Sequence, residues 1–533
     1  MDLHSAAAEG FAKYVMNTKN RKKAVYIIYG RTVFVVLAML MQAIVLLLCF
    51  TWLASYQVYL TAGLTVLSAA LIVYILNSKS NPAFKLAWII PILIFPVFGG
   101  LIYIFLELQP GPRHVRKKLK QIQEETCYLT PKNQEAAKRL ANIDRQAGNL
   151  SEYLFRYGGY PVYEDTELVY FPQGEDKFAF LLRELEKARE FIFLEYFILE
   201  EGEMWDAVLE VLKRKAAEGV EVRLMYDGMC CLALLPYSYP SYIRRFGIAC
   251  KMFQPIAPVL DTMQNNRDHR KILVIDGKVA FTGGINFADE YINRKIRFGH
   301  WKDTAIMLKG EAVKSFTLMF LQMWNITEKT PEKYERYIKA PESFGAHREH
   351  CPGFVIPYGD SPLDDENVGE HLYMDILNTA RNYVHIMTPY LIIDNEMITA
   401  LLYAAKRGVE VQILLPHIPD KKLAFMLAHS YYPRLLEGGV KIYEYTPGFI
   451  HAKVFTSDGK EAVVGTVNLD YRSFYLHFEC GAYLYGCREI QRIEQDFQET
   501  LAKCRPMIME DYKKLSPVHR LLGHILKIFA PLM

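Results

Sequence analysis

One pattern occurs twice in this sequence and constrains its fold more than any other feature. The first copy is His269-x-Lys271-x4-Asp276, followed by Gly283-Gly284-x-Asn286. The second copy, at the same internal spacing, is His451-x-Lys453-x4-Asp458, followed by Gly465-Thr466-x-Asn468. A single His-x-Lys is common by chance. Two copies that agree at His, Lys, Asp, Gly and Asn, 182 residues apart, indicate a duplicated unit.

The segments before the two motifs repeat as well. In the first half we predict a strand over Phe191–Phe197, a helix over Met204–Ala217 and a strand over Val220–Tyr226. The second half repeats this order with Val384–Tyr390, Met397–Lys406 and Val409–Leu415, and each motif follows one more predicted strand, Ile248–Phe253 or Val440–Tyr445. The alternation predicts an α/β fold of two pseudo-symmetric α/β/α domains, each of roughly 180 residues, that share one active site.

The first 110 residues are different in character. Three hydrophobic segments cover about residues 31–53, 56–76 and 86–106, and an apolar helix of about 20 residues crosses a bilayer core. We predict N-terminal transmembrane helices for the first two segments. The third is interrupted by Pro91, Pro96, Gly99 and Gly100, so it either spans with a kink or enters the membrane and returns.

Basic residues cluster at 19–31, 79–85 and 113–120, on the flanks of these segments. The positive-inside rule places all three clusters in the cytoplasm, which favours a re-entrant third segment. We therefore expect a multi-pass protein of the cell membrane with its catalytic domains on the cytoplasmic face. The basic clusters are expected to contact an anionic membrane surface.

These patterns predict six regions. They are a membrane anchor (1–110), a basic linker (111–150), a first catalytic domain (151–326), an inter-domain linker (327–365), a second catalytic domain (366–514) and a C-terminal amphipathic helix (515–533). The last is either a packed helix or an interfacial membrane helix. Nine cysteines without a CxxC pair argue against a disulfide framework or a zinc site, and a net charge of +3 argues against nucleic acid as partner. Nothing indicates the oligomeric state.

The repeated residues suit the cleavage of a phosphodiester. One imidazole attacks phosphorus and the other moves the proton, while Lys271 and Lys453 offset the charge of the phosphate oxygens. Asn286 and Asn468 are predicted to bind the phosphate. A carboxylate on the far nitrogen of each ring would orient it, and Asp303 and Glu479 are the candidates because they occupy similar contexts.

The motif also contains Asp276 and Asp458, and we include both in the catalytic set with the two histidines and two lysines. We predict that His269 and Lys271 lie on one strand with their side chains on the same face, and that His451 and Lys453 repeat this arrangement. Asp276 and Asp458 fall at the far end of these strands, which favours a structural role for each. No metal or other cofactor is predicted. From the residues alone either histidine can be the nucleophile.

These residues resemble the HKD motif of the phospholipase D superfamily, in full in both copies. Asn266–Lys271, Asp289-Glu290-Tyr291, Gly465–Phe474 and the Ala87–Tyr103 segment further resemble bacterial cardiolipin synthases. The resemblance implies phosphatidyl transfer between two phosphatidylglycerol molecules, with His269 as nucleophile and His451 as general acid/base. His477 departs from the family pattern, which has Asn at that position.

The motifs alone leave other reactions open. Water or another alcohol can replace the second lipid as acceptor, and nucleic acid is a possible phosphodiester. A lipid-binding scaffold without activity is disfavoured, because no His or Lys of either motif is lost.

Overall fold

The computed structural model describes Leu40, Ile44 and residues 57–107, 110–255, 262–328, 330, 332–339 and 351–532. The chain forms two compact units. The smaller comprises residues 1–114, 255–265 and 525–533, and the larger comprises 115–254 and 266–524. Both motifs lie in the larger unit.

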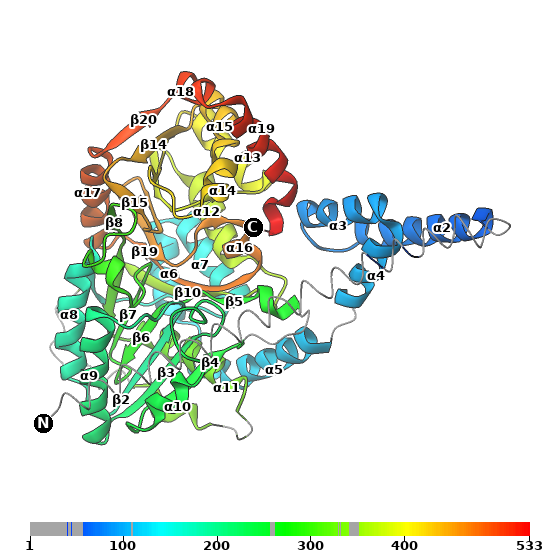
Figure 1. The fold of residues 1–533 in the computed structure, drawn as a ribbon. Coiled ribbons are helices and arrows are strands. Elements are labelled where there is room, and N and C mark those ends of the chain that lie inside the picture. Colours follow the sequence, from blue (N-terminus) through cyan, green and yellow to red (C-terminus); the bar gives the residue numbers. More distant parts are fainter. Residues whose placement is uncertain are drawn as a thin grey trace, which may run out of the picture. The chain divides into compact units, whose positions relative to one another are not determined.

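The first half of the larger unit is built on a seven-stranded mixed sheet (Figure 1). Its strands, in spatial order, are β1 (Glu167–Phe171), β9 (Ala305–Lys309), β7 (Val279–Gly283), β6 (Ile272–Ile275), β2 (Phe191–Tyr196), β3 (Glu221–Asp227) and β4 (Ala249–Phe253). The central strands β2 and β3 are parallel, and β6 joins β2 antiparallel.

Helices cover both faces of this sheet. Figure 1 shows α8 (Gly174–Glu186) and α9 (Glu203–Ala217) together on one face, where Trp205 of α9 belongs to the same apolar core as Leu194 of β2. On the other face Phe193 stacks on Phe320 of α11 (Val313–Asn325), with ring centres 4.7 Å apart. Residues of β2 alternate between the two faces, so the strand is largely apolar on both sides, as its mostly apolar sequence predicts.

The second half repeats the first strand for strand. Its sheet runs β10 (Phe354–Asp360), β19 (His477–Tyr485), β17 (Glu461–Gly465), β16 (Val454–Ser457), β11 (Tyr383–Met387), β13 (Glu410–Pro416) and β14 (Lys441–Tyr445), and β20 (Cys504–Met507) extends it. Its main helices are α12 (Val368–Thr379), α13 (Asn395–Lys406) and α17 (Glu489–Leu501). The predicted pair of α/β domains is therefore present. Because β10 pairs with β19, the second sheet begins at Phe354, ahead of the boundary predicted at 366.

Two short parallel pairings connect the halves. β5 (Arg267–Asp268) pairs with β19, and β15 (Gly448–Ile450) pairs with β8 (His300–Lys302). Each half thus adds to the other the short strand that precedes its own motif.

The remaining elements are short or connect the halves. The segment predicted as a basic linker consists of α5 (Pro110–Thr126), η1 (Cys127–Leu129), α6 (Gln134–Ile143) and the first part of α7 (Arg145–Gly158), and the side chain of Asp144 caps α7. The others are α10 (Tyr239–Arg244), η2 (Thr262–Asn265), η3 (Asp289–Ile292), η4 (Tyr334–Tyr337), β12 (Leu391–Ile392), α14 (Lys422–His429), α15 (Tyr432–Glu437), β18 (Leu469–Asp470), α16 (Tyr471–Tyr475), α18 (Met509–Lys514) and α19 (Pro517–Leu526).

The smaller unit contains α2 (Gln57–Leu76), α3 (Pro82–Ile94), α4 (Pro96–Glu107) and η6 (Lys527–Leu532). The third hydrophobic segment folds back on itself, because the chain breaks between α3 and α4. The rings of Trp88 and Tyr103 lie 5.4 Å apart, although one straight helix would separate residues 15 positions apart by about 22 Å. A Cβ on Gly99 would lie 2.8 Å from the carbonyl oxygen of Pro91, so glycine permits the close approach of the two helices.

Among the residues described, no helix combines the length and apolar character needed to cross a membrane. Of the segment 31–53, only Leu40 and Ile44 are among those residues. The transmembrane assignment of this segment stays a prediction, and that of segment 56–76, which contains α2, is not confirmed.

Candidate active site

The two motifs lie where the halves meet. We predicted that His269 and Lys271 lie on a strand, and this is wrong in detail, because they occupy the link between β5 and β6. The backbone N–H of His269 donates to the carbonyl of Phe478 (3.0 Å), and that of His451 donates to the carbonyl of Lys302 (2.6 Å). Because these backbone groups pair with the other half, the strands of the two main sheets begin only after the motif lysines, β6 at Ile272 and β16 at Val454.

Each histidine is held by a carboxylate from the opposite half. Nδ1 of His269 lies 2.9 Å from both carboxylate oxygens of Glu479, and Nδ1 of His451 lies 2.6 Å from Oδ2 of Asp303. Both carboxylates are fully buried. The two residues chosen from the sequence as histidine-orienting groups therefore contact the imidazoles, in an exchanged arrangement that leaves Nε2 of each ring for chemistry.

The carboxylates are positioned differently in the two halves. Glu479 accepts a hydrogen bond from the hydroxyl of Thr466. Asp303 lies against Gly284, where an added Cβ would come within 2.0 Å of Oδ1. The first motif thus has Gly284, which leaves room for the shorter Asp303. The second motif has Thr466 at the same place, and its hydroxyl binds the longer Glu479.

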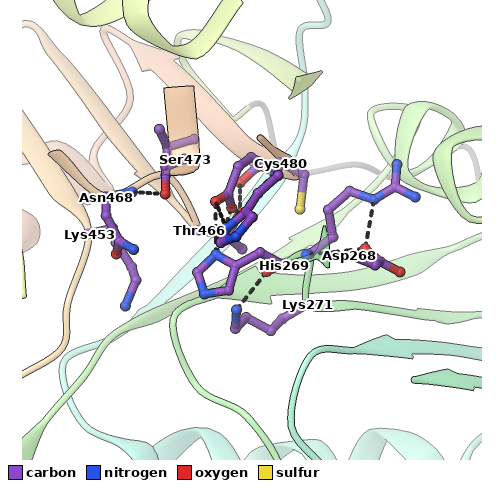
Figure 2. A network of polar contacts seen from close by, with 12 residues as sticks. Asp268, His269, Lys271, Lys453, Thr466, Asn468, Ser473 and Cys480 are labelled. Carbon is purple, nitrogen blue, oxygen red and sulfur yellow. Dashed lines mark hydrogen bonds and ion pairs between the residues drawn. The ribbon is translucent and has the colours of Figure 1, made fainter. Parts of the chain in front are cut away.

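Both lysines are buried beside the histidines. Nζ of Lys271 donates to the carbonyl of His269 (2.6 Å), and Nζ of Lys453 lies 2.9 Å from Nδ1 of His451 and also contacts its carbonyl. Figure 2 shows His269 and Lys271 in one close view with Lys453 and Asn468 of the second half. Burial lowers the pKa of Lys271 to about 8 and that of Lys453 to about 7. An anion bound here would favour the charged ammonium forms.

The histidines are neutral in the free site. Burial, then Lys271 and Lys453, hold the pKa of His269 well below its usual range. Burial and Lys453 lower the pKa of His451 to about 4, although Asp303 opposes the shift. A neutral His269 suits a nucleophile, and a phosphate anion would favour the proton on His451.

The two asparagines are close by but already bonded. Asn286 accepts from the backbone N–H of Ile198 (3.0 Å) and donates to the hydroxyl of Tyr291 (2.8 Å). The Asn468 side chain donates to Asp470 (3.1 Å). Each side-chain amide keeps one further N–H for a ligand, and Asn286 also fixes Tyr291, whose ring lies 5.5 Å from that of His451.

The motif aspartates are remote from this chemistry. Asp276 accepts three hydrogen bonds from the backbone N–H groups of residues 189–191, and Asp458 does the same for residues 381–383, all at 2.7–2.9 Å. Both have positive φ (52°), which Asp tolerates better than most residues. Each therefore fastens a turn to the start of a central strand, and neither reaches the imidazoles.

Some residues of the site were not predicted from the sequence. Arg270 forms a buried ion pair with Glu195, and its Nε lies 3.5 Å from Asp268. The available signal was Glu195 itself, one charge in an otherwise apolar buried strand. Phe197 packs edge-on against His269, with ring centres 4.6 Å apart.

His477, noted only as a departure from a family pattern, also lies at the site. Its ring centre is 5.4 Å from that of His269, and its Nδ1 is 3.6 Å from Glu479. Burial lowers the pKa of His477 to about 3, so its ring is neutral as well.

Comparison with known proteins identifies the family. Residues 181–324 and 373–501 match the family described as "Cardiolipin synthase, PLD-like domain", and residues 66–106 match "Phospholipase_D-nuclease N-terminal". A cardiolipin synthase of Geobacillus sp. is 34% identical over 482 residues (89% of this chain, 94% of the relative), and cardiolipin synthase 2 of Bacillus anthracis is 34% identical over 458 residues (85% and 87%). An uncharacterized protein of Streptococcus mutans is 50% identical over 462 residues (87% and 99%).

Among solved structures, phosphatidylserine synthase of Haemophilus influenzae aligns with a TM-score of 0.53 at 13% identity, covering 73% of this chain and 98% of that one. This likeness concerns the fold. The matched regions include both motifs and both exchanged carboxylates, and the relatives are matched over most of their length. The chain belongs to the cardiolipin synthase family of phospholipase D-like proteins.

Proposed function

We propose that this protein is a cardiolipin synthase that transfers a phosphatidyl group between two phosphatidylglycerol molecules and releases glycerol. The observation that carries the proposal is the pair of buried imidazoles, each oriented by a carboxylate of the other half and each beside a lysine. Family membership supplies the lipid substrate, because the named relatives are cardiolipin synthases.

In the first step Nε2 of His269 attacks phosphorus. The P–N bond forms while the bond from phosphorus to the headgroup glycerol breaks, and His451 donates its proton to the departing glycerol oxygen. Lys271 and Lys453 stabilise the charge on the non-bridging oxygens, and the free N–H groups of Asn286 and Asn468 are placed to assist. Glu479 stabilises the positive charge that develops on the His269 ring.

In the second step a second phosphatidylglycerol replaces glycerol. Its headgroup hydroxyl gives its proton to neutral His451 and its oxygen attacks phosphorus, which breaks the P–N bond and yields cardiolipin. Asp303 holds His451 through both proton transfers. The surroundings of His269 and His451 differ, which is consistent with unequal roles for the two histidines. The assignment of His269 as nucleophile follows the family resemblance.

The enzyme is proposed to work at the membrane. The folded-back α3–α4 segment suits insertion into one leaflet. The C-terminal helix α19 and η6 expose a run of large apolar side chains: Leu521, Leu522, Ile525, Ile528 and Phe529. Exposed apolar residues on an amphipathic terminal helix suit an interfacial position, and the basic residues of α5 suit anionic headgroups. With residues 31–76 as an anchor in the cell membrane and the catalytic domains on the cytoplasmic face, acceptor lipid is concentrated at the site and water is scarce.

The test uses purified full-length protein and vesicles of phosphatidylglycerol alone, without added divalent metal. Equimolar cardiolipin and glycerol are expected. Phosphatidic acid without cardiolipin would mean that water is the acceptor and would overturn the proposed reaction. Absence of any product would overturn phosphatidylglycerol as the sole substrate.

A further inference from the structure

His477 is a buried imidazole that the proposed reaction does not use. It is 7% exposed, and among the described residues neither of its ring nitrogens has a hydrogen-bond partner. A buried polar group left without a partner costs about 1–3 kcal/mol. Nδ1 of this ring lies 3.6 Å from the carboxylate of Glu479, and the ring centre lies 5.4 Å from that of His269.

We propose that His269, His477 and Glu479 form a binding site for a transition-metal ion of the zinc type, and that the bound ion inhibits the enzyme. One ligand atom from each of the three residues lies within 4.8 Å of the others. All three residues are buried, so the cluster differs from the exposed acidic groups that occur commonly without an ion.

The spacing fits tetrahedral zinc. Two ligand atoms about 2.0–2.1 Å from one zinc ion are about 3.3 Å apart, and two bound imidazoles have ring centres about 5 Å apart. Here the carboxylate lies 2.9 Å from Nδ1 of His269 and 3.6 Å from Nδ1 of His477, and the two ring centres are 5.4 Å apart. Small side-chain rotations are enough to place three ligands on one ion, with the fourth position open to water or a phosphate oxygen.

The ligand types also restrict which ions fit. Two imidazoles and one carboxylate suit zinc, cobalt and similar ions, whereas magnesium and calcium prefer oxygen ligands. The nearby ammonium groups of Lys271 and Lys453 repel any cation, which further disfavours ions that lack strong bonds to nitrogen. We therefore expect selectivity for zinc over magnesium.

The second half provides an internal comparison. The residue two positions before the carboxylate is His477 in one half and Trp301 in the other, and the ring of Trp301 lies 5.4 Å from that of His451. The two residues occupy equivalent places, but an indole cannot bind a metal ion. Among the residues that the structure describes, such a cluster therefore lies beside His269 and not beside His451.

Inhibition follows from the identity of the ligands. An ion on the His269 ring either occupies the attacking nitrogen or breaks the hydrogen bond to Glu479 and withdraws electron density from the ring. This part rests on the proposed function, in which His269 is the nucleophile. The binding itself does not, so binding and turnover are measured separately.

The experiment uses metal-free full-length protein in detergent. Cobalt is titrated and its visible absorption is recorded, and zinc is then added to displace it. The expected result is one equivalent of tetrahedral cobalt, displaced by zinc and unaffected by excess magnesium. His477→Asn removes one of the three ligands and is expected to weaken cobalt and zinc binding at least about 10-fold, since loss of even an outer-shell partner costs about 10- to 100-fold. His385→Asn is the matched control, since His385 is also buried and bonded to a glutamate (Glu494, 2.8 Å) but lies outside the cluster.

Turnover is then measured with and without zinc, each variant relative to its own rate in chelator. Zinc is expected to inhibit the wild type and His385→Asn reversibly, and His477→Asn at least 10-fold more weakly. Absence of cobalt binding to the wild type, or equal binding by His477→Asn, would overturn the site. If His477→Asn does not fold, the wild-type cobalt spectrum still decides, because octahedral cobalt bound only by oxygen would also overturn it. Metal binding without inhibition would retain the site and remove its inhibitory role.

Discussion

Nδ1 of His269 lies 2.9 Å from the carboxylate of Glu479, a residue 210 positions later in the other half of the molecule. The reverse contact joins His451 to Asp303. Asp303 directly follows β8 and Glu479 lies near the start of β19, and these two strands pair with the segments before the opposite histidines. The same strand pairing therefore brings each carboxylate to its histidine. Both histidines depend on the interface between the halves.

The exchange predicts distinct defects for the two carboxylates. Glu479→Gln weakens the nucleophile, whereas Asp303→Asn weakens the proton donor, and each is expected to reduce turnover about 100-fold or more. A phosphatidyl ester of p-nitrophenol separates the two effects, because its leaving group needs no proton. With this substrate Asp303→Asn should still release a burst of p-nitrophenol and Glu479→Gln should not.

The position of the trapped phosphoryl group checks the same assignment. His269→Ala is expected to abolish phosphoenzyme formation, and His451→Ala is expected to allow it with the p-nitrophenyl ester. A phosphohistidine found on His451 would reverse the roles of the two residues.

Gly284 is predicted to accept no side chain. In Gly284→Ala the new Cβ would meet Asp303, so the carboxylate must move and His451 loses its partner. Turnover should fall to about the level of Asp303→Asn. Thr466→Ala is the comparison in the other half, since it removes one hydroxyl contact to Glu479 without a clash. A Gly284→Ala enzyme as active as Thr466→Ala would contradict this account.

Lys453 is predicted to favour catalysis at the expense of stability. Its ammonium is buried, and its pKa of about 7 shows that the folded protein disfavours the charged form. Lys453→Met should abolish turnover while leaving the apparent Tm unchanged or raising it by about 2–4 °C, the shift that about 1 kcal/mol produces in a large domain. Thermal unfolding in detergent measures the second effect. A Tm that falls by several degrees would mean that the ammonium stabilises the fold.

Anion binding should weaken as the pH rises. In the free site Lys453 and Lys271 have pKa values of about 7 and 8, so between pH 6 and pH 9 both lose their proton and the site loses positive charge. Tungstate is a suitable probe because its own charge is constant over this range. Calorimetry is expected to show an affinity that falls progressively with pH in the wild type. The dependence should be smaller in Lys453→Met, and an equal dependence in that variant would remove Lys453 from the explanation.

Asp458 is predicted to act on stability and not on the reaction. Asp458→Ala leaves three backbone N–H groups without their acceptor and should destabilise the second domain by about 1–3 kcal/mol. Asp458→Asn should be milder, because Asn tolerates positive φ and keeps one acceptor oxygen. Activity per folded molecule should remain within about threefold of the wild type in both. A large loss of activity in fully folded Asp458→Asn would assign this residue to catalysis.

Much of the fold could be predicted from the sequence because the chain contains two copies of the same pattern, which can be compared with each other. Two copies of one strand–helix–strand pattern predicted two similar domains, and the predicted helix Met204–Ala217 differs from α9 by one residue. The ends of the second domain were less accessible. β10 is an edge strand in a region rich in charge and proline, and only its pairing with β19 makes it part of the sheet.

The residue types of the active site could be predicted from the sequence, but the contacts between them could be predicted less well. The motifs supplied the histidines and lysines, and the similar contexts of Asp303 and Glu479 supplied the two carboxylates. Local spacing contains no information on which half each carboxylate serves, because that depends on contacts between residues about 150 to 210 positions apart. Arg270 and Glu195 lie in the same half, and their ion pair, like the hydrogen bonds of Asn286 to Ile198 and Tyr291, became visible only in three dimensions.

The paired segments β5–β19 and β15–β8 have a consequence for the history of such a chain. A single copy of this repeat would contain a histidine without its carboxylate and a carboxylate without its histidine. Two identical copies that associate about a twofold axis would satisfy both at once. Once the two copies are joined in one gene, their sequences can change independently. The two halves now differ at equivalent positions, with Thr466 in place of Gly284 and His477 in place of Trp301.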